Sequence, residues 1–373
     1  MEKCRVLELI GGSLTDGGAE TLVKDYVLNI DKKRFDTAVF VDWKISEMAN
    51  TIRLTDSGQL IYTAYPNYSL FWRGINRFFR KTFMIRGIKK AIRLFNPDVI
   101  HIHLAALQYL LFVKEDLKGI KLFYTCHSTV KAKLIDNPEE DIAANRLSHE
   151  FGMRFIALHD SMADELNERY GVKNSIVINN GIDIERFHNV KETKVDIRKT
   201  LGIPEQTFVV GHVGRFVDVK NHDFILKVFE KVHEEKPDSL LLLIGDGEQL
   251  EQFKDRVKAA GLEKSVLILS NRSDIPQLLK AMDVFVFPSK FEGLGIALIE
   301  AQAAKLRCIV SKNVPKEAFV SELVIPLSLS DSLDSWCDTI LDSKRRGPYE
   351  DRLEEFNIKS AVRKLEKVYL GQI

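Results

Sequence analysis

The 373-residue sequence predicts an α/β protein with two domains of similar size, each built around a parallel β-sheet. Three observations lead to this fold class. The chain is long enough to bury more than one core. Apolar strand-like runs alternate with helical segments from end to end, as in parallel sheets, and Asn179-Asn180-Gly181 marks a tight turn near the middle. We therefore expect a junction within residues 180–187, with a first domain over residues 1–186 and a second over residues 187–355.

Strand-like runs can be assigned along both halves of the chain. Those of the first half are Arg5–Ile10, Thr37–Val41, Val99–His103, Leu122–Cys126, Arg154–Leu158 and Ser175–Asn179. Those of the second half are Val209–Val213, Ser239–Ile244, Val266–Leu269, Val284–Phe287 and Cys308–Val310. Helical segments such as Phe224–Glu234 and Gln249–Ala260 separate them, and Ile358–Tyr369 has a helical pattern of apolar residues. Two such units would meet at a cleft, the usual place for a ligand in these folds.

Composition restricts the class and the compartment of the protein. With 45% hydrophobic residues, 29% charged residues and a net charge of +1, the chain has an ordinary globular composition and no overall attraction to nucleic acid. Its four cysteines lack the spacing of a zinc site or redox pair, so we interpret them as inert thiols in a reducing compartment. The segment MEKCRVLELIGG predicts a strand rather than a signal peptide, and no apolar run reaches the ~18 residues of a membrane span. We expect a cytoplasmic location.

The segment Phe291–Glu300 is the most informative part of the sequence. The run Val284–Phe287 predicts a strand that ends at Pro288, and residues 296–304 predict a buried helix. Gly293, Leu294 and Gly295 lie at the start of this helix, where glycines let backbone N–H groups approach a ligand and the helix dipole favours an anion. A diphosphate there would leave Glu292 near a sugar and Glu300 near a ribose, which is the layout of a nucleotide-sugar site.

The same residues also fit a core helix with one glutamate at its cap and another on its surface. Two glutamates at this spacing are a weak signal by themselves. Glu300 favours the functional interpretation, because Leu298, Ile299 and Ala301 flank it and a carboxylate in so apolar a helix needs a partner.

The sequence FEGLGIALIEAQAA resembles the signature of the retaining family-4 glycosyltransferases, in which two glutamates are separated by seven residues. Asn180-Gly181-Ile182-Asp183 with Phe187, and Leu201-Gly202-Ile203-Pro204, also fall in the family's order. The chain looks like the branch that builds bacterial capsular polysaccharide or exopolysaccharide. The resemblance implies a GT-B fold, with two Rossmann-like domains facing across a cleft and a C-terminal helix (356–373) crossing back to the first domain. Lys305 and Arg307 replace the usual Gly and Pro, so we expect a different loop shape before Cys308, on the acceptor side.

A second candidate segment, GHVGR at residues 211–215, follows a predicted strand, and Lys220 comes shortly after it. Arg215 offers a planar fork of donors and Lys220 a compact charge, so together they suit a departing diphosphate. A glycine turn followed by two solvated cations is the alternative. The resemblance implies that both residues bind the donor's phosphates, and that the glycine turn at Gly245 lies near the base or the phosphates.

Two further candidates lie in the first half. Gly17 and Gly18 follow the first strand, but Gly-x-Gly-x-x-Gly is absent from the sequence, which argues against a nicotinamide cofactor. The resemblance implies that this loop contacts the donor phosphate and the acceptor. His127 follows Leu122–Cys126 and would reach the ligand end of the sheet. It is either a structural hydrogen-bonding residue or, as the resemblance implies, part of the active site. We interpret three other histidines as structural: His101, His103 and His159.

Metal-binding patterns are missing from the sequence. It contains no Asp-x-Asp motif, and no histidine and acidic residues occur at ligand spacing. We therefore expect neither an essential metal nor another cofactor, with cations, the helix dipole and glycine loops stabilising the diphosphate instead.

The segment 70–95 contains eight Lys or Arg residues and no acidic residue. In residues 70–83, aromatic side chains alternate with a helical stripe of cations (Arg73, Arg77, Arg80 and Lys81), which predicts a contact with an anionic membrane surface. Nucleic acid is the alternative partner, but no recognised binding module accompanies the segment. For residues 85–95 we expect a core helix, with Ile85, Ile88, Ile92 and Phe95 inward and the cations in solvent.

These observations predict a retaining glycosyltransferase that moves a sugar from a nucleotide-sugar donor, which we expect to be a UDP-sugar, to a glycan or lipid-linked acceptor. Glu292 would hold sugar hydroxyls, Glu300 the ribose, and Arg215 with Lys220 the leaving diphosphate. An epimerase of the same fold would convert the donor without an acceptor. A non-catalytic nucleotide-binding subunit would be expected to lose these residues, and a phosphorylase-like enzyme needs a pyridoxal-phosphate lysine that cannot be located.

Overall fold

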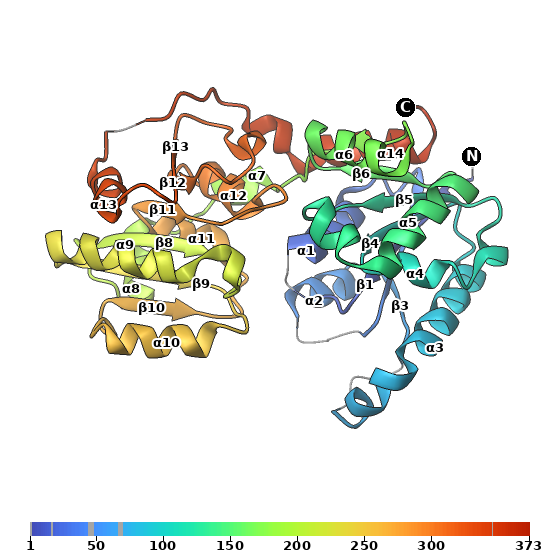
Figure 1. Ribbon diagram of the computed structural model, residues 1–373, viewed down its shortest axis with the longest axis horizontal. Helices are drawn as coiled ribbons and strands as arrows, with labels where there is room; N and C mark the ends of the chain where they lie inside the picture. The colour runs from blue at the N-terminus through green and yellow to red at the C-terminus, as the bar shows by residue number, and fades with distance from the viewer. Residues whose placement is uncertain (1, 16–17, 44–47, 66–69, 345) are drawn as a thin grey trace. The chain divides into compact units, whose positions relative to one another are not determined.

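The computed structural model describes residues 2–15, 18–43, 48–65, 70–344 and 346–373. The chain divides into two compact units, one of Met1–Gly181 with Ile358–Ile373 and the other of Ile182–Asn357. Each contains one sheet with parallel pairing between all neighbouring described strands, which confirms the predicted fold class of two parallel α/β domains (Figure 1).

The first unit contains a seven-stranded sheet in the order β3-β2-β1-β4-β5-β6-β7. Its strands are β1 (Cys4–Gly11), β2 (Phe35–Val41), β3 (Leu60–Thr63), β4 (Val99–Leu104), β5 (Lys121–Thr125), β6 (Arg154–Ala157) and β7 (Ile176–Val177). Its helices are α1 (Gly18–Asn29), α2 (Ala49–Asp56), α3 (Leu70–Phe95), α4 (Leu107–Leu110), η1 (Lys114–Leu117), η2 (Lys131–Ile135), α5 (Pro138–Glu150), α6 (Asp160–Tyr170) and α14 (Ile358–Tyr369).

The second unit contains a six-stranded sheet in the order β10-β9-β8-β11-β12-β13. Its strands are β8 (Phe208–Val213), β9 (Ser239–Ile244), β10 (Val266–Leu269), β11 (Val284–Phe287), β12 (Arg307–Ser311) and β13 (Val324–Leu327). Its helices are α7 (Ile184–His188), α8 (Lys194–Thr200), η3 (Asp218–Lys220), α9 (His222–Glu235), α10 (Leu250–Ala259), α11 (Ile275–Ala281), α12 (Ile296–Ala303), η4 (Lys316–Ala318), α13 (Leu333–Leu341) and η5 (Leu353–Phe356).

Two strands that the sequence analysis missed, β3 and β13, each lie at an edge of their sheet. β13 contains Pro326, which lacks an N–H for the ladder and is tolerated at an edge but seldom in a central strand. β3 has an exposed Leu60 and no fully buried residue, so its pattern lacks the apolar run of a central strand.

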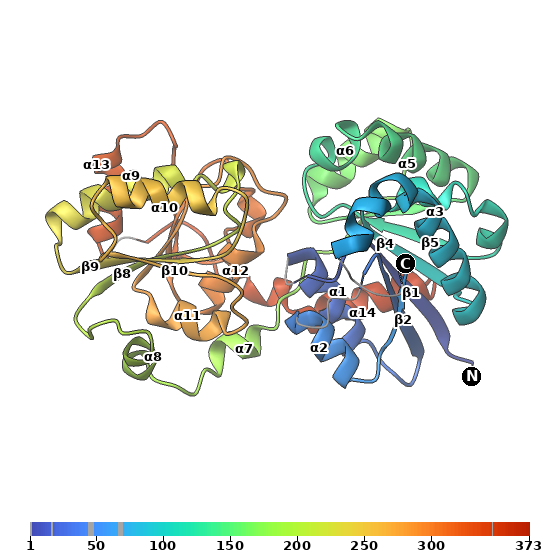
Figure 2. The ribbon, with the colours of Figure 1, turned by 90° about the horizontal axis from the view of Figure 1, so that it is seen from below.

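The C-terminal helix α14 belongs to the first unit, as predicted (Figure 2). Its buried residues Ile358, Val362 and Leu365 pack in one cluster with Tyr26 of α1 and with β-strand residues. The chain passes close to Gly181 as the helix begins, since a Cβ at this position would lie 2.4 Å from Ile358 Cα. Only glycine fits there, which gives the Asn-Gly turn near the middle of the chain a structural reason.

All four cysteines are free thiols; Cys126, Cys308 and Cys337 are buried, and burial raises the pKa of Cys126 to about 12. In the part of the chain that the structure describes, no helix combines the length and the apolar character needed to cross a membrane.

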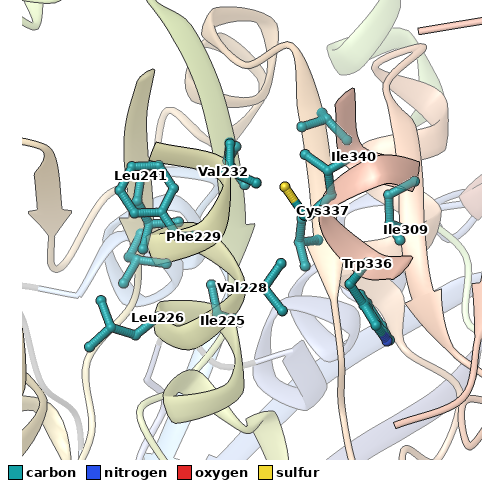
Figure 3. Close-up of a cluster of buried hydrophobic side chains, with 14 of the residues drawn as sticks. Ile225, Leu226, Val228, Phe229, Val232, Leu241, Ile309, Trp336, Cys337 and Ile340 are labelled. Atoms are coloured by element: carbon teal, nitrogen blue, oxygen red, sulfur yellow. The ribbon is translucent and has the colours of Figure 1, made fainter. Parts of the chain in front are cut away.

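In the core of the second unit, α9 and α13 pack directly against each other. Figure 3 shows Val228 and Val232 of α9 facing Trp336, Cys337 and Ile340 of α13. The Trp336 indole also donates a hydrogen bond from Nε1 to the Ser328 carbonyl oxygen, 3.0 Å away, so its one polar atom is satisfied.

Phe229 lies in this core with a 1% exposed side chain, so Phe229→Ala is expected to lower the free energy of unfolding of the second unit by about 3–5 kcal/mol. The reason is the loss of buried apolar surface together with the cavity that remains. Val195→Ala, at a 44% exposed position of the same unit, serves as the control and should change it by less than about 0.5 kcal/mol. Chemical denaturation followed by circular dichroism measures both; equal effects would contradict the assignment of this core.

Candidate functional site

In the second unit, the candidate residues follow three neighbouring strands. Arg215 comes after β8, Gly245 after β9 and Glu292 after β11, and these strands are adjacent in the order β9-β8-β11. Because the strands are parallel, their carboxyl ends share one edge of the sheet, where ligands bind in open α/β folds. The fold therefore brings together three segments that are separate in sequence.

The loops after β8 and β11 are tied to each other. The Lys290 backbone N–H donates to the Val219 carbonyl oxygen at 2.8 Å, and Asn221 Nδ2 donates to the Pro288 carbonyl oxygen at 3.3 Å. Asn221 adopts a left-handed backbone with φ 58° at the start of α9, a conformation that asparagine tolerates better than most residues. These contacts fix the positions of both loops.

The two tied loops present an ion pair at their surface. Lys220 Nζ lies 2.6 Å from Glu292 Oε1, and the two side chains are only 17% and 12% exposed. The ammonium group also lies 4.8 Å from the centre of the Phe287 ring, within range of a cation–π interaction. The sequence analysis assigned Lys220 to the phosphates and Glu292 to the sugar, but did not foresee that they pair, because 72 residues separate them.

The loop before α12 has the geometry expected of a ligand-binding turn. Gly295 forms the N-cap of α12 with φ 93°, a left-handed conformation that a residue with a Cβ rarely adopts. Gly293 and Leu294 are buried beside it, and Leu294 anchors the loop with 2% exposure. Glu300 is half-buried in α12, between buried residues at 298, 299 and 301. The first N–H groups of an α-helix have no partner within the helix itself, and the helix dipole favours an anion at this end.

The turn after β9 also requires glycine. The Phe216 N–H donates to the Asp246 carbonyl oxygen at 2.9 Å, which holds the turns after β8 and β9 together. A Cβ on Gly245 would lie 2.0 Å from the Gly214 carbonyl oxygen, so a larger residue would push the two turns apart. Arg215 is exposed at this junction.

The two departures from the family pattern lie around the end of α12. Lys305 has φ 60°, so lysine here adopts the left-handed conformation that a glycine would take. Arg307 is buried, with Nη1 2.6 Å from the Thr339 carbonyl oxygen and Nη2 bonded to the Ile340 carbonyl oxygen, and it thereby satisfies carbonyls in the last turn of α13. Arg307 thus serves the core of this unit, a role that no pattern in the sequence indicated.

In the first unit, His127 comes two residues after the end of β5, and its ring is part of a buried chain of polar groups. His127 Nε2 lies 2.8 Å from His103 Nδ1, and His103 Nε2 lies 2.7 Å from Glu8 Oε2. His103 belongs to β4 and Glu8 to β1, and these strands are neighbours. His127 is therefore one end of a chain that reaches the core, and His103, which we interpreted as structural, is the middle member of that chain.

A second branch extends from the same carboxylate. Tyr369 of α14 donates to Glu8 Oε1 at 3.1 Å, and its hydroxyl also lies 2.6 Å from His101 Nδ1. His101 Nε2 in turn lies 2.6 Å from Thr125 Oγ1. Register explains the cluster: Glu8 pairs with His101 and His103 with Thr125, so alternate residues of three strands share one face of the sheet.

Burial sets the charge of these groups. It raises the pKa of Glu8 to about 8 and lowers the pKa of His103 to about 3. The pKa of His127 is also lowered, by burial and by the neighbouring His103 and Lys133. Both histidines are therefore neutral near pH 7.

Glu8, His101 and His103 also form a group with ligand atoms within 4.8 Å of one another, the one such group found among the described residues. Every one of these ligand atoms takes part in the hydrogen bonds given above, and the 2.7 Å contact between His103 and Glu8 is itself of hydrogen-bond length. Hydrogen bonds therefore connect all three side chains of this group.

The remaining predicted residues can be placed briefly. Gly18 begins α1 just after the carboxyl end of β1, while Gly17 lies outside the described residues. In α3, Ile88, Ile92 and Phe95 are buried, as predicted for residues 85–95, whereas Ile85, predicted with them, is only half-buried. The side chains of residues 70–78 lie outside the description. Arg80 donates to Asp42 at 2.7 Å and Lys81 Nζ lies 4.0 Å from the centre of the Phe112 ring, so both cations also contact the protein itself.

With this geometry established, the comparisons place the chain among known proteins. The family model described as Glycosyltransferase Family 4 matches residues 16–186, and the model described as Glycosyl transferases group 1 matches residues 193–323. A UDP-Gal:alpha-D-GlcNAc-diphosphoundecaprenol alpha-1,3-galactosyltransferase of Escherichia coli is 30% identical over 323 residues, which is 79% of this chain and 82% of that protein. The putative glycosyltransferase EpsF of Bacillus subtilis is 28% identical over 353 residues, 92% of this chain and 88% of EpsF.

Solved structures show the same architecture. HepE of Anabaena, solved with UDP and glucose, matches with a TM-score of 0.76 and 18% identity over 99% of this chain and 100% of HepE. WaaG, a glycosyltransferase involved in lipopolysaccharide biosynthesis, matches with a TM-score of 0.69 and 14% identity over 98% of this chain and 95% of WaaG. The fold is therefore of the GT-B type, and the matched family models identify the chain as a glycosyltransferase. By its matched regions and its relatives, the chain belongs to glycosyltransferase family 4.

The strained conformation of Lys305 generates a stability prediction. Lys305→Gly removes the left-handed cost of roughly 1–2 kcal/mol but adds backbone entropy to the unfolded chain. We expect a net gain of about 0.5–1 kcal/mol in the free energy of unfolding of the second unit. Lys254→Gly, inside α10, is the matched control and should lose about 1 kcal/mol. Urea denaturation of both variants measures the difference, and a loss in both would contradict the assigned backbone.

Proposed function

We propose that this glycosyltransferase is a retaining enzyme that transfers a sugar from a UDP-sugar to a glycan or lipid-linked acceptor in cell-surface polysaccharide biosynthesis. The observation that carries the proposal is the Lys220–Glu292 pair at the glycine-held start of α12, on the edge where the loops after β8, β9 and β11 converge. The neighbour HepE, solved with UDP and glucose, and the Escherichia coli relative, named for UDP-Gal and a diphosphoundecaprenol-linked sugar, support the choice of donor and acceptor class.

Each site residue has a proposed task. Arg215 and Lys220 hold the diphosphate, and the Gly293–Gly295 turn offers backbone N–H groups to it. As the diphosphate attracts the Lys220 ammonium, Glu292 Oε1 gains freedom to accept hydrogen bonds from hydroxyls of the donor sugar. Glu300 binds the ribose, and Gly245 allows the turn after β9 to approach the turn after β8 closely. In the first unit, Gly17, Gly18 and His127 are the residues that we assign to ligand binding.

The proposed reaction takes place on one face of the sugar. The bond between the anomeric carbon and the diphosphate oxygen breaks, and the acceptor hydroxyl oxygen bonds to the same face of that carbon. Its proton passes to an oxygen of the leaving diphosphate. Arg215 and Lys220 stabilise the charge that develops on the leaving group, the kind of electrostatic effect that accounts for most of many enzymes' rate enhancement. We propose that these cations suffice without an essential metal or cofactor.

We further propose that residues 70–83 contact the inner face of the plasma membrane, so that a cytoplasmic enzyme reaches a lipid-linked acceptor. Support comes from the four cations and the absence of acidic residues within residues 70–83, and from Phe79, which is exposed. Arg73→Glu with Arg77→Glu should abolish co-sedimentation with phosphatidylglycerol vesicles. Arg86→Glu with Lys90→Glu, at exposed positions of the same helix, should retain most of it; equal loss in both would indicate general charge attraction and contradict the proposal.

A donor screen tests the nucleotide-sugar site. We expect one class of nucleotide sugar, the UDP-sugars, to raise the melting temperature of the purified protein equally with and without EDTA. Glu300→Gln should remove most of this stabilisation through loss of the ribose contact, whereas Glu263→Gln, at an exposed position of the same unit, should leave it unchanged. No response to UDP-, GDP-, ADP- or CMP-sugars would contradict the proposal, and loss of the response in EDTA would contradict its metal independence.

Kinetic measurements and product analysis distinguish a retaining sugar transferase from an inverting transferase and from an epimerase. Lys220→Ala should lower kcat by roughly 10²–10³-fold through loss of leaving-group stabilisation, with a smaller change in KM for the donor. Anomeric NMR of the first product formed should show the donor's anomeric configuration. An inverted product would contradict the retaining mechanism, and conversion of the donor sugar without an acceptor would identify an epimerase.

A further inference from the structure

The chain of Glu8, His103 and His127 joins a buried carboxyl group to the carboxyl edge of the first sheet. Glu8 is 1% exposed and His103 is fully buried, while His127 follows β5 at the edge where ligands bind in such folds. The far ring nitrogen, His127 Nδ1, is the one nitrogen of the two linked rings that has no hydrogen-bond partner among the described residues. A polar atom buried without a partner is costly, which points to a ligand or a proton as its missing partner.

The hydrogen bonds allow two arrangements of protons. When Glu8 is ionised, His103 donates from Nε2 to Glu8, His127 donates from Nε2 to His103 Nδ1, and His127 Nδ1 carries a lone pair. When Glu8 is protonated on Oε2, every bond reverses: Glu8 donates to His103 Nε2, His103 donates from Nδ1 to His127 Nε2, and His127 Nδ1 carries the proton. Both imidazoles are neutral in both arrangements.

We propose that these three residues form a proton relay, in which a proton taken up at His127 Nδ1 is stored on Glu8, so that Glu8 decides whether His127 offers its ligand a donor or an acceptor. The step is balanced. His127 Nδ1 gains one N–H bond, its Nε2 proton moves to His103 Nδ1, the His103 Nε2 proton moves to Glu8 Oε2, and the system gains one proton. His127 and its ligand are at the reacting edge only if the proposed function holds, whereas Glu8 and His103 are positioning residues that act through His127.

The surroundings direct the stored proton to Oε2. Tyr369 of α14 already donates to Oε1, while Oε2 makes the shorter contact, 2.7 Å, with His103. His101 of β4 lies 3.4 Å from Oε2 and is hydrogen-bonded to Tyr369 and Thr125, and Tyr26 of α1 faces the same carboxylate. At the other end, His127 is faced by His103 and by Lys133 of η2.

Burial shifts the pKa of the carboxyl group and the pKa of the histidine in the directions that the relay requires. The pKa of Glu8 is raised to about 8, so the carboxyl group holds a proton at neutral pH, while the pKa of His103 is lowered to about 3, so neither ring takes a second proton there. At pH 7 His127 therefore presents an N–H, which suits a ligand oxygen with free lone pairs, such as that of a phosphate or a sugar hydroxyl. Above about pH 8 the same atom presents a lone pair.

Long-range ¹H–¹⁵N spectra of the full chain with ¹⁵N-labelled histidine test the relay without any substrate. His127 signals are identified by their loss in His127→Gln. We expect Nδ1 of His127 to change from protonated to unprotonated as the pH rises from 6 to 10, with the ring never doubly protonated. In Glu8→Gln the tautomer should stay constant over that range. A constant tautomer in the unaltered protein, or a doubly protonated ring, would overturn the proposal.

Tyr369→Phe is the matched control for disturbance of the cluster. It removes a hydrogen bond that lowers the pKa of Glu8 but leaves the link through His103, so the tautomer change should persist with a higher midpoint. A lower midpoint or a lost change would count against Glu8 as the storage site. Adding one equivalent of zinc to EDTA-treated protein completes the control: strong shifts at His101 and His103 would identify a metal site and overturn the relay.

Stability provides a second measurement if Glu8→Gln gives weak spectra. The unfolded chain releases the Glu8 proton near pH 4.5, whereas the folded chain keeps it to about pH 8, so the first unit loses stability as the pH rises between these values. Between about pH 7.5 and 8 the buried histidines, whose pKa in the unfolded chain is near 6.5, are almost entirely neutral in both states and offset little of this loss. Glu8→Gln should remove the slope in that interval, and an unchanged slope would contradict the assignment.

The pH dependence of UDP-sugar affinity tests the proton relay and the proposed donor site separately. With one hydrogen bond at stake, affinity for the UDP-sugar should fall about tenfold from pH 7 to pH 9, and should not change with pH in Glu8→Gln. No binding at any pH, combined with the tautomer change, would leave the relay standing and reject the donor assignment. Equal pH dependence in both proteins would reject the role of Glu8 in ligand binding.

Discussion

Parallel pairing is the constraint on which the candidate sites depend. Within each sheet the paired strands are parallel to one another, so their carboxyl ends meet at one edge of that sheet. In the second unit this edge gathers Lys220, Glu292 and the Gly245 turn, which are far apart in the sequence. In the first unit the register of β1, β4 and β5 places Glu8, His103 and Thr125 on one face, and His127 follows at the carboxyl end of β5. Neither group would form if the neighbouring strands were antiparallel.

The Lys220–Glu292 pair and the cluster around Glu8 differ in their exposure to water, so the free-energy cost of leaving a charge unpaired differs between them. The Lys220–Glu292 pair is partly solvated, so the pair can be broken by a ligand that offers comparable charge. Glu8 lies in the core, where an unpaired charge is costly, and its carboxyl group holds a proton instead. The first arrangement suits exchange of one anionic partner for another, and the second suits storage of a proton without net charge separation.

Much of the fold could be predicted because the signals are local. The central strands are apolar runs, and α14 shows its apolar stripe in one short segment. β3 and β13 were missed because an edge strand needs neither continuous burial nor a full set of N–H donors, as Leu60 and Pro326 illustrate. The glycines at 181, 245 and 295 were found as turn signals, but the reason each must be glycine depends on close approaches and backbone angles.

The candidate site was predictable in its residue types and not in its pairings. Lys220 and Glu292 were each assigned to a ligand, yet their contact depends on how the loops after β8 and β11 are tied together, which no spacing reveals. His103 and Glu8 carried a weak signal, since polar residues inside apolar strands require partners. Identifying those partners requires the order β1-β4-β5 and its register, because a shift of one residue would turn His103 to the opposite face. The hydrogen-bonded chain that ends at His127 is therefore built by residues of other strands. The residues next to His127 in the sequence do not reveal it.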